Sequence, residues 1–311
     1  MLVNLLSRKS FFSQIILILL FLALFLMKHN PLNYDLESAL GVFFYWMTLA
    51  VSILFFNNSN LIKYPGIALF YFLIAMIVFS DIAMHYRLSI SFFASTLIFW
   101  RLLQAERRPE NKKFLFDIGL LLSLSAFFYP PSFLLLFFLL FAFLYKQTIN
   151  LKSFILFIIG ITLPLLLGAQ ILFLLDRNDW FEAYQSAFHI NHWHANIWGL
   201  IPLAVLILIA WLDHLSNLTT QDVNKRHFYF LGFLYFLNWV VILLIFGGDH
   251  HYTLAFLGLP IAIFLTRITQ YHTSFVFKEL FLWSYLLTMT GFYFSKEIVE
   301  IYQDLLGNVS F

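Results

Sequence analysis

Long apolar runs recur along this chain from residue 11 to residue 295, and only short polar segments separate them. Hydrophobic residues make up 62% of the 311 residues and charged residues only 11%, whereas charged residues are about 25% of an ordinary soluble domain. A soluble fold could not cover this much apolar surface, since large exposed apolar patches on soluble monomers are rare. The runs therefore predict an all-α protein that crosses a membrane many times, and they exclude a soluble domain, a disordered chain and a nucleic-acid binder.

Eleven runs are continuously apolar, as transmembrane helices are, and lack the alternating pattern of barrel strands. The first run follows Arg8 and Lys9 but no small-residue cleavage site comes after it, so it is interpreted as an uncleaved helix. No loop is long enough for a soluble domain, and residues 1–311 are expected to form a single integral membrane domain. The predicted helices span residues 11–27, 38–56, 66–80, 88–104, 114–129, 132–145, 153–175, 197–212, 228–246, 252–267 and 279–295.

Lysine and arginine are distributed unevenly between the predicted loops. If the N-terminus is cytoplasmic, 14 of the 18 basic residues lie on the cytoplasmic side, and the external side holds only Lys28, Arg87, Arg177 and Lys296. Basic residues retained on the cytoplasmic side set the orientation of membrane proteins. The bias therefore predicts a polytopic bundle with the N-terminus inside and the C-terminus outside, surrounded by the lipids of a bacterial inner membrane.

Acidic residues and histidines show the opposite bias. Ten of the 16 acidic residues and seven of the ten histidines lie on the predicted external side. The orientation rule does not require this, because Asp and Glu contribute little to topology. We expect a functional site at the external face, although polar residues also gather in loops simply because water is there.

Asp35 and Glu37 stand just before the second predicted helix and are the candidate catalytic residues. A carboxylate at this depth can act as a general base or hold a metal ion. The alternative is helix capping, since acidic residues favour helix N-termini. The sequence leaves both interpretations open.

Asp81, His85 and Arg87 follow the third predicted helix and are candidate substrate-binding residues. Asp81 and His85 are four residues apart and would share a helical face. A guanidinium at the external interface suits a phosphate group. The alternatives for Arg87 are pairing with Asp81 or extension of its side chain to the interface.

The longest external connection begins with aromatic residues at helical spacing. Trp180, Phe181, Tyr184 and Phe188 would lie on one face of a short helix in the membrane interface. This segment is therefore predicted to form an amphipathic helix.

Histidines follow this segment at the spacing of metal ligands. His189, His192 and His194 resemble a cluster for zinc, iron or manganese. The alternative is a belt of Trp and His at the interface. A divalent metal is the only cofactor that the sequence suggests.

A fourth external segment is a predicted tight turn that begins with Gly247 and Gly248. Asp249 could orient a histidine or join the metal site, and His250 and His251 could contact substrate. The alternative is an ordinary turn that contains an aspartate.

This layout resembles the GT-C superfamily of membrane glycosyltransferases, which use polyprenyl-phosphate-linked sugars. The shared features are the cytoplasmic start, the acidic residue before helix two, the many further helices and the interfacial helix. The segment from Gly119 to Phe133, with its proline pair, resembles a stretch that such proteins carry between middle helices. More locally, the segment from Phe99 to Leu165 is similar to an uncharacterised family of bacterial polytopic membrane proteins.

The GT-C resemblance implies a transferase that acts on a lipid-linked donor at the outer face of the inner membrane. Asp35 or Glu37 would deprotonate the acceptor, and Arg87, a protonated histidine or a metal would meet the departing polyprenyl phosphate. The alternative is a non-enzymatic membrane subunit of an envelope secretion, motility or export assembly, buried among partner subunits. A third hypothesis is a lipid-modifying metalloenzyme. The lack of charge near the middle of the predicted helices argues against ion-coupled transport.

Overall fold

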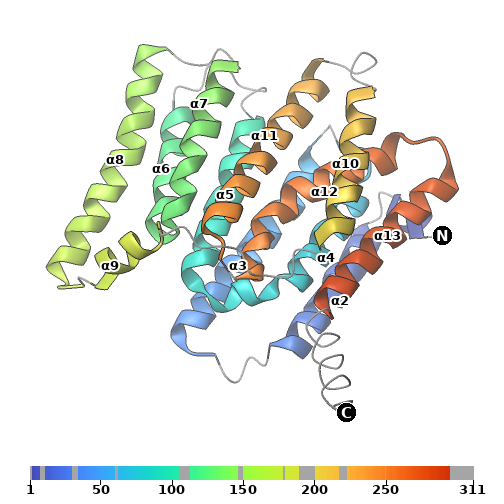
Figure 1. The fold of residues 1–311 in the computed structure, drawn as a ribbon, viewed down its shortest axis with the longest axis horizontal. Helices are drawn as coiled ribbons and strands as arrows, with labels where there is room; N and C mark the ends of the chain where they lie inside the picture. Colours follow the sequence, from blue (N-terminus) through green and yellow to red (C-terminus); the bar gives the residue numbers. More distant parts are fainter. Residues whose placement is uncertain are drawn as a thin grey trace, which may run out of the picture.

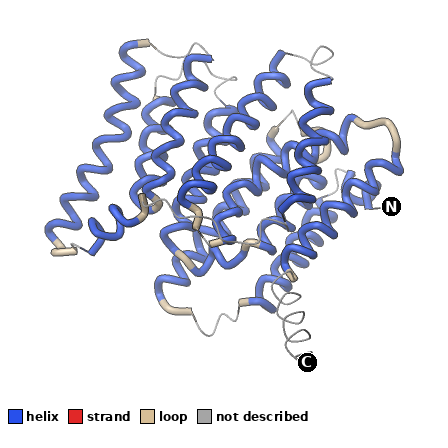
Figure 2. The backbone as a smooth tube through the Cα atoms, viewed as in Figure 1, coloured by secondary structure: helices blue, strands red, loops and turns tan. Residues whose placement is uncertain are grey.

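The computed structural model describes residues 2–7, 11–29, 34–59, 62–104, 113–145, 150–177, 179–188, 200–216, 223–248 and 250–294. The regular segments among them are all helical, and these residues contain no strand (Figure 2). The all-α class is thereby confirmed. Among the described residues, four helical stretches are long and apolar enough to cross a membrane: Leu36–Asn58, Leu151–Leu174, Arg226–Phe246 and His251–Tyr271.

Each of the eleven predicted ranges overlaps an α-helix of the structure. The α-helices are α1 (Leu2–Ser7), α2 (Phe11–Lys28), α3 (Leu36–Asn58), α4 (Pro65–Val78), α5 (Tyr86–Gln104), α6 (Phe114–Phe128), α7 (Leu135–Tyr145), α8 (Leu151–Leu174), α9 (Asp179–Ser186), α10 (Ile201–Ser216), α11 (Val223–Phe246), α12 (Gly258–Tyr271) and α13 (Phe275–Tyr293). Within the described residues, 3-10 turns connect some of these helices: η2 (Ser80–Met84), η4 (Pro130–Leu134) and η7 (His251–Leu257).

Two boundaries differ because 3-10 turns replace predicted helix. The segment predicted at 132–145 begins its α-helix at Leu135, because Pro130 and Pro131 lack the N–H groups that an α-helix needs. The segment predicted at 252–267 begins as η7, and α12 then continues to Tyr271. Arg267 therefore lies one turn inside α12 rather than at its end.

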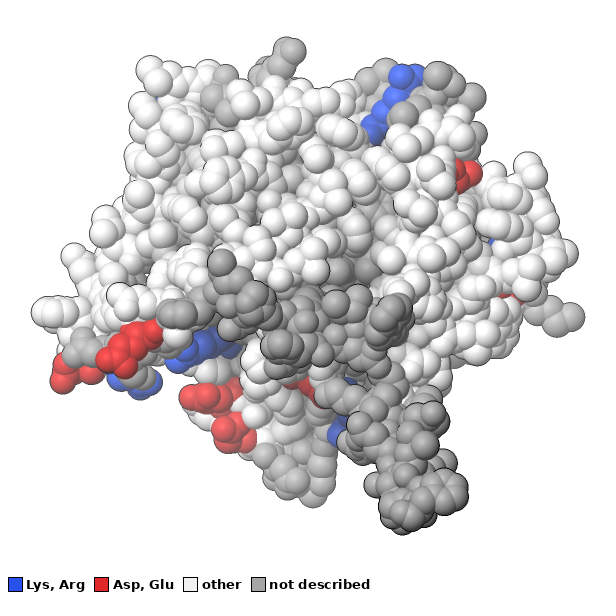
Figure 3. All heavy atoms as spheres, viewed as in Figure 1, with Lys and Arg blue, Asp and Glu red and all other residues white. Residues whose placement is uncertain are grey.

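The helices pack as a bundle with α8 at one edge and the α2 and α13 pair at the other (Figure 1). The apolar window of the η7–α12 stretch is 94% buried, whereas that of α8 is only 17% buried. The visible face of the bundle shows few charged residues, and these lie near its margins (Figure 3). A helix that is apolar all round and buried belongs in a core, and one that exposes its apolar face fits a lipid environment.

Two glycines allow α6 and α8 to approach closely. A Cβ atom added to Gly160 would lie 2.5 Å from the carbonyl oxygen of Phe116, and one added to Gly119 would lie 2.5 Å from that of Phe157. Small residues at such positions let helix backbones meet, which is how helices commonly associate in lipid. The glycine pair therefore fixes the peripheral helix α8 to the bundle.

The substitution Gly160→Ala should destabilise the protein, because its Cβ would push apart two backbones. Overpacking of this kind costs about 1–3 kcal/mol, which outweighs the roughly 0.5–1 kcal/mol that alanine gains over glycine within a helix. The matched control is Gly291→Ala in α13, where an added Cβ meets nothing within 4 Å. Thermal unfolding of the purified protein in detergent should show a lower midpoint for Gly160→Ala only. Equal midpoints for the two variants would contradict the close packing of α6 and α8.

Candidate functional site

Asp81 lies at the centre of a polar cluster built from three segments that are distant in sequence. Its Oδ1 atom is 2.9 Å from Lys28 Nζ and 3.7 Å from His29 Nε2, and its Oδ2 atom is 3.8 Å from His251 Nε2. Lys28 and His29 come from the end of α2, Asp81 from η2 and His251 from η7. We use the name Asp81 cluster for Lys28, His29, Asp81, His85, His250 and His251.

The backbone of η2 holds Asp81 in this place. Ile82 and Ala83 are fully buried, so the apolar side of the turn anchors it beneath the cluster. A Cβ atom at Gly41 of α3 would collide with the carbonyl oxygen of Ala83. Because glycine removes that obstacle, η2 packs directly on α3 and presents Asp81 towards α2 and η7.

Tyr252 connects the remaining imidazoles. Its ring stacks on His85 with the centroids 4.6 Å apart and on His250 with the centroids 5.2 Å apart. Ser80 extends the polar contacts on the other side, where its Oγ atom is 3.1 Å from His29 Nε2. The cluster thus forms a continuous surface of imidazoles, hydroxyls and one ion pair.

The opposite charges of Lys28 and Asp81 balance each other within the cluster. Burial alone would raise the pKa of Asp81, but hydrogen bonds from His251 and Lys28 hold it below its ordinary value. Burial lowers the pKa of His29, and the Lys28 ammonium lowers it further, against the opposing effect of Asp81. Burial likewise lowers the pKa of His85, with a smaller contribution from His250 that Asp81 opposes. At neutral pH both imidazoles are therefore uncharged and can accept a proton.

Four of the five predicted substrate-binding residues meet in this cluster, and Arg87 makes its contacts elsewhere. Its guanidinium stacks on Trp180 of α9 at 4.1 Å, and its Nε atom donates to the Tyr86 hydroxyl at 3.3 Å. The helix predicted from the aromatic spacing is present as α9, and Trp180 also stacks on Phe127 of α6 at 5.2 Å. In this structure Arg87 serves to attach α9 to the bundle.

Asp35 acts as the N-cap of α3. Its carboxylate accepts a hydrogen bond of 2.9 Å from the backbone N–H of Ser38. Hydrogen bonding from the Ser38 side chain, and then this backbone bond, lower the pKa of Asp35. Glu37 lies in the first turn of the helix and is exposed. The capping role is thus observed for Asp35, while the catalytic role of Asp35 and Glu37 stays a prediction.

The predicted metal ligands His189, His192, His194 and Asp249 lie outside the described residues. Among the residues that the structure describes, no group of three or more His, Asp or Glu side chains is arranged to hold a metal ion. Next to Asp81, the Lys28 ammonium supplies the positive charge that balances the carboxylate. The divalent metal therefore stays a prediction for the four residues named above.

The sequence interpretation missed a buried ion pair at the other end of α12. Arg267 is 1% exposed, and its Nη1 atom lies 2.9 Å from Asp213 Oδ2 of α10. The guanidinium also lies over the Tyr229 ring of α11 at 5.2 Å. The segment after Arg267 has no Gly or Pro before residue 272, and this continuity was the signal that the helix extends further.

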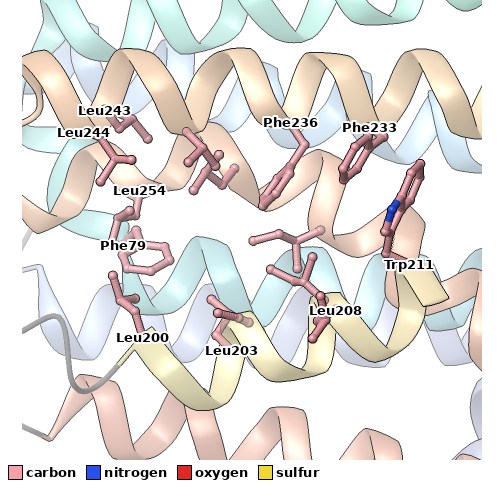
Figure 4. A pocket seen from close by; sticks show the side chains of 15 residues that line it. Phe79, Leu200, Leu203, Leu208, Trp211, Phe233, Phe236, Leu243, Leu244 and Leu254 are labelled. Atoms are coloured by element: carbon pink, nitrogen blue, oxygen red, sulfur yellow. The ribbon is translucent and has the colours of Figure 1, made fainter.

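An apolar groove of about 390 Å³ runs between α10 and α11 (Figure 4). Leu200 and Trp211 mark its extent along α10, which at 1.5 Å per residue is about 16 Å. That is about half of the roughly 30 Å hydrocarbon core of a bilayer. Phe79, which precedes η2, and Leu254 of η7 line one end, so the groove reaches the segments that carry Asp81 and His251.

The fold and this site define a helical protein with membrane-spanning segments and a polar cluster at the end of an apolar groove. The chain belongs to DUF6427, a family of unknown function, whose sequence model matches residues 1–302. No curated protein and no solved structure matches the chain. The expected similarity to an uncharacterised family is consistent with this result, and the GT-C resemblance remains an inference from sequence layout.

Replacement of Asp81 by Asn should lower the pKa values of His29 and His85 further, because it removes the negative charge that stabilises their protonated forms. NMR titration of imidazole-labelled protein in micelles, with resonances assigned by single His→Gln variants, would measure both values. In the unsubstituted protein both histidines should titrate below the ordinary histidine pKa of about 6.5.

The matched control is Asp117→Asn, which removes a carboxylate paired with Arg101 at 3.3 Å. This control variant should leave the pKa values of His29 and His85 unchanged. Two results would contradict the geometry of the cluster. One is titration of His29 and His85 above about 6.5 in the unsubstituted protein, and the other is that their pKa values are the same in the Asp81→Asn variant.

Proposed function

We propose that this protein binds a lipid with its phosphate-bearing headgroup at the Asp81 cluster and its chain in the groove between α10 and α11. The observation that carries the proposal is the junction of the two features at Phe79 and Leu254. A site of this form suits an amphipathic ligand, because binding sites are mostly apolar with a few polar groups that fix orientation. The length of the groove, about one leaflet, supports a chain that enters from the leaflet on the cluster's side.

The chemistry of the cluster supports a phosphorylated headgroup. The Lys28 ammonium is a strong donor to phosphate oxygens, and uncharged His29 and His85 gain a proton when a negative group approaches. We further propose, from the layout and the basic-residue bias, that the site faces the outside of the inner membrane. There the protein would transfer a group from a polyprenyl-phosphate-linked donor.

A transferase of this kind needs a base to take the proton of the acceptor hydroxyl. Asp35 and Glu37 remain the candidates that the GT-C resemblance offers. His85 is a second candidate, because its lowered pKa keeps it unprotonated at neutral pH, as a general base must be. Its ring lies in the cluster itself, where the headgroup of the lipid would sit.

The alternative proposal is a membrane subunit of an envelope assembly. The observation in its favour is α8, whose apolar window is only 17% buried and which packs mainly on α6. Its exposed leucines and isoleucines would suit a helix of a partner subunit as well as lipid. A stable complex that copurifies in the membrane and is lost with α8 substitutions alone would favour this alternative.

Filling the groove should weaken binding of the lipid. Ala204→Phe places a large side chain among the lining residues, whereas the matched control Val205→Phe lies on the same helix, is 47% exposed and does not line the groove. Native mass spectrometry can count the polyprenyl phosphate retained after incorporation into phosphatidylcholine nanodiscs. We expect about tenfold weaker retention for Ala204→Phe, equivalent to roughly 1.4 kcal/mol, and no change for Val205→Phe. Equal retention of polyprenyl phosphate in both variants would show that the groove is not part of the binding site.

Asp35→Asn separates catalysis from capping, because Asn caps helices as well as Asp does. The variant should therefore keep its expression and thermal midpoint. If Asp35 is the base, complementation of a deletion strain should fail, as loss of a general base costs about 10²–10⁴ in rate. His85→Gln tests the second candidate in the same assay. Full complementation by an Asp35→Asn, Glu37→Gln double variant would exclude both carboxylates as the base.

A further inference from the structure

A second apolar groove, of about 330 Å³, lies between α2, α4 and α13. Leu17, Leu20 and Leu24 line it along α2, and Leu286 lines it from α13. From Leu17 to Lys28 the groove covers eleven residue steps of α2, or about 16 Å. It therefore also spans about one leaflet of a bilayer. A groove of this length with an almost wholly apolar lining suits an extended hydrocarbon chain.

The polar groups at the mouth of this groove can all donate hydrogen bonds. Lys28, Ser80 and Thr290 line it with an ammonium and two hydroxyl groups. The Lys28 ammonium lies 5.2 Å from the Tyr293 ring, which is also part of the lining. An ammonium beside hydroxyls recognises the acceptor-rich, anionic oxygens of a phosphate.

The two grooves reach adjacent residues beside Asp81. Phe79 lines the first groove and the adjacent residue, Ser80, lines the second. Between them, Phe79 packs edge-on against Phe292 of α13 with the ring centroids 5.6 Å apart. The Lys28–Asp81 ion pair thus stands where two leaflet-length grooves converge.

We propose that the second groove binds a chain of a second lipid, whose anionic phosphate headgroup contacts Lys28. The Asp81 cluster would then lie between the headgroups of two lipids, one in each groove. The first lipid and its contact with Lys28 rest on the proposed function, whereas the second lipid shares Lys28 but has a groove of its own. The second ligand is then a phospholipid of net negative charge.

Substitutions in α2 test the second groove with a matched pair. Leu24 lines the groove and is 39% exposed, while Leu22 is 36% exposed on the same helix and does not line it. The full chain would be placed in phosphatidylcholine nanodiscs that contain phosphatidylglycerol and polyprenyl phosphate, and retained lipids counted by native mass spectrometry. Leu24→Trp should lower phosphatidylglycerol retention about tenfold and leave polyprenyl phosphate bound, and Leu22→Trp should change neither. Lys28→Gln should abolish the preference for phosphatidylglycerol over phosphatidylcholine.

The outcomes distinguish the two proposals. Equal phosphatidylglycerol retention in Leu24→Trp and Leu22→Trp would overturn the second site and leave the first intact. Simultaneous loss of both lipids in Leu24→Trp would also overturn it, since one lipid would then occupy both grooves. Loss of polyprenyl phosphate alone in Ala204→Phe would support two separate sites. Unchanged polyprenyl phosphate in that variant would contradict only the proposed function.

Discussion

The ion pair between Lys28 and Asp81 is the interaction on which the organisation of this site depends. It joins the end of α2 to the turn between α4 and α5, two segments that the chain separates by more than fifty residues. A carboxylate in partly apolar surroundings is costly unless it is paired. The pairing keeps Asp81 ionised, and the same carboxylate then attracts His29 and His251. Loss of the ammonium would leave a charge that the neighbouring imidazoles alone must balance.

The apolar helices around the pair determine what can approach it. The stretch formed by η7 and α12 is almost wholly buried and makes the floor of the first groove, while the second groove lies between α2, α4 and α13. Both grooves cover about one leaflet, and both reach η2. The bundle therefore brings two apolar channels and one polar cluster together at one face. This combination is suited to amphipathic ligands rather than to ions or soluble metabolites.

The helices were predictable from sequence because continuous apolar runs and helix-breaking residues are local signals. The joining of Asp81 and His85 with His250 and His251 was suggested by their shared side of the membrane. The contribution of Lys28 and Tyr252 was not suggested by the sequence, because each reaches the cluster only through packing of segments that are far apart in sequence. For Asp35 the sequence left capping and catalysis open, and the bond to Ser38 shows the cap. Arg267 was predicted at the end of a helix, and local sequence did not indicate its ion pair because the partner, Asp213, lies on another helix.

A cryo-electron microscopy map of the protein in nanodiscs that contain polyprenyl phosphate would test the central claim most directly. The account predicts phosphate density within hydrogen-bonding distance of Lys28 or the imidazoles of the Asp81 cluster. Chain density should continue from it between α10 and α11 towards Trp211 (Figure 4). Phosphate density at the opposite end of α12, near Arg267, or a groove filled by the side chains of a partner helix would contradict it.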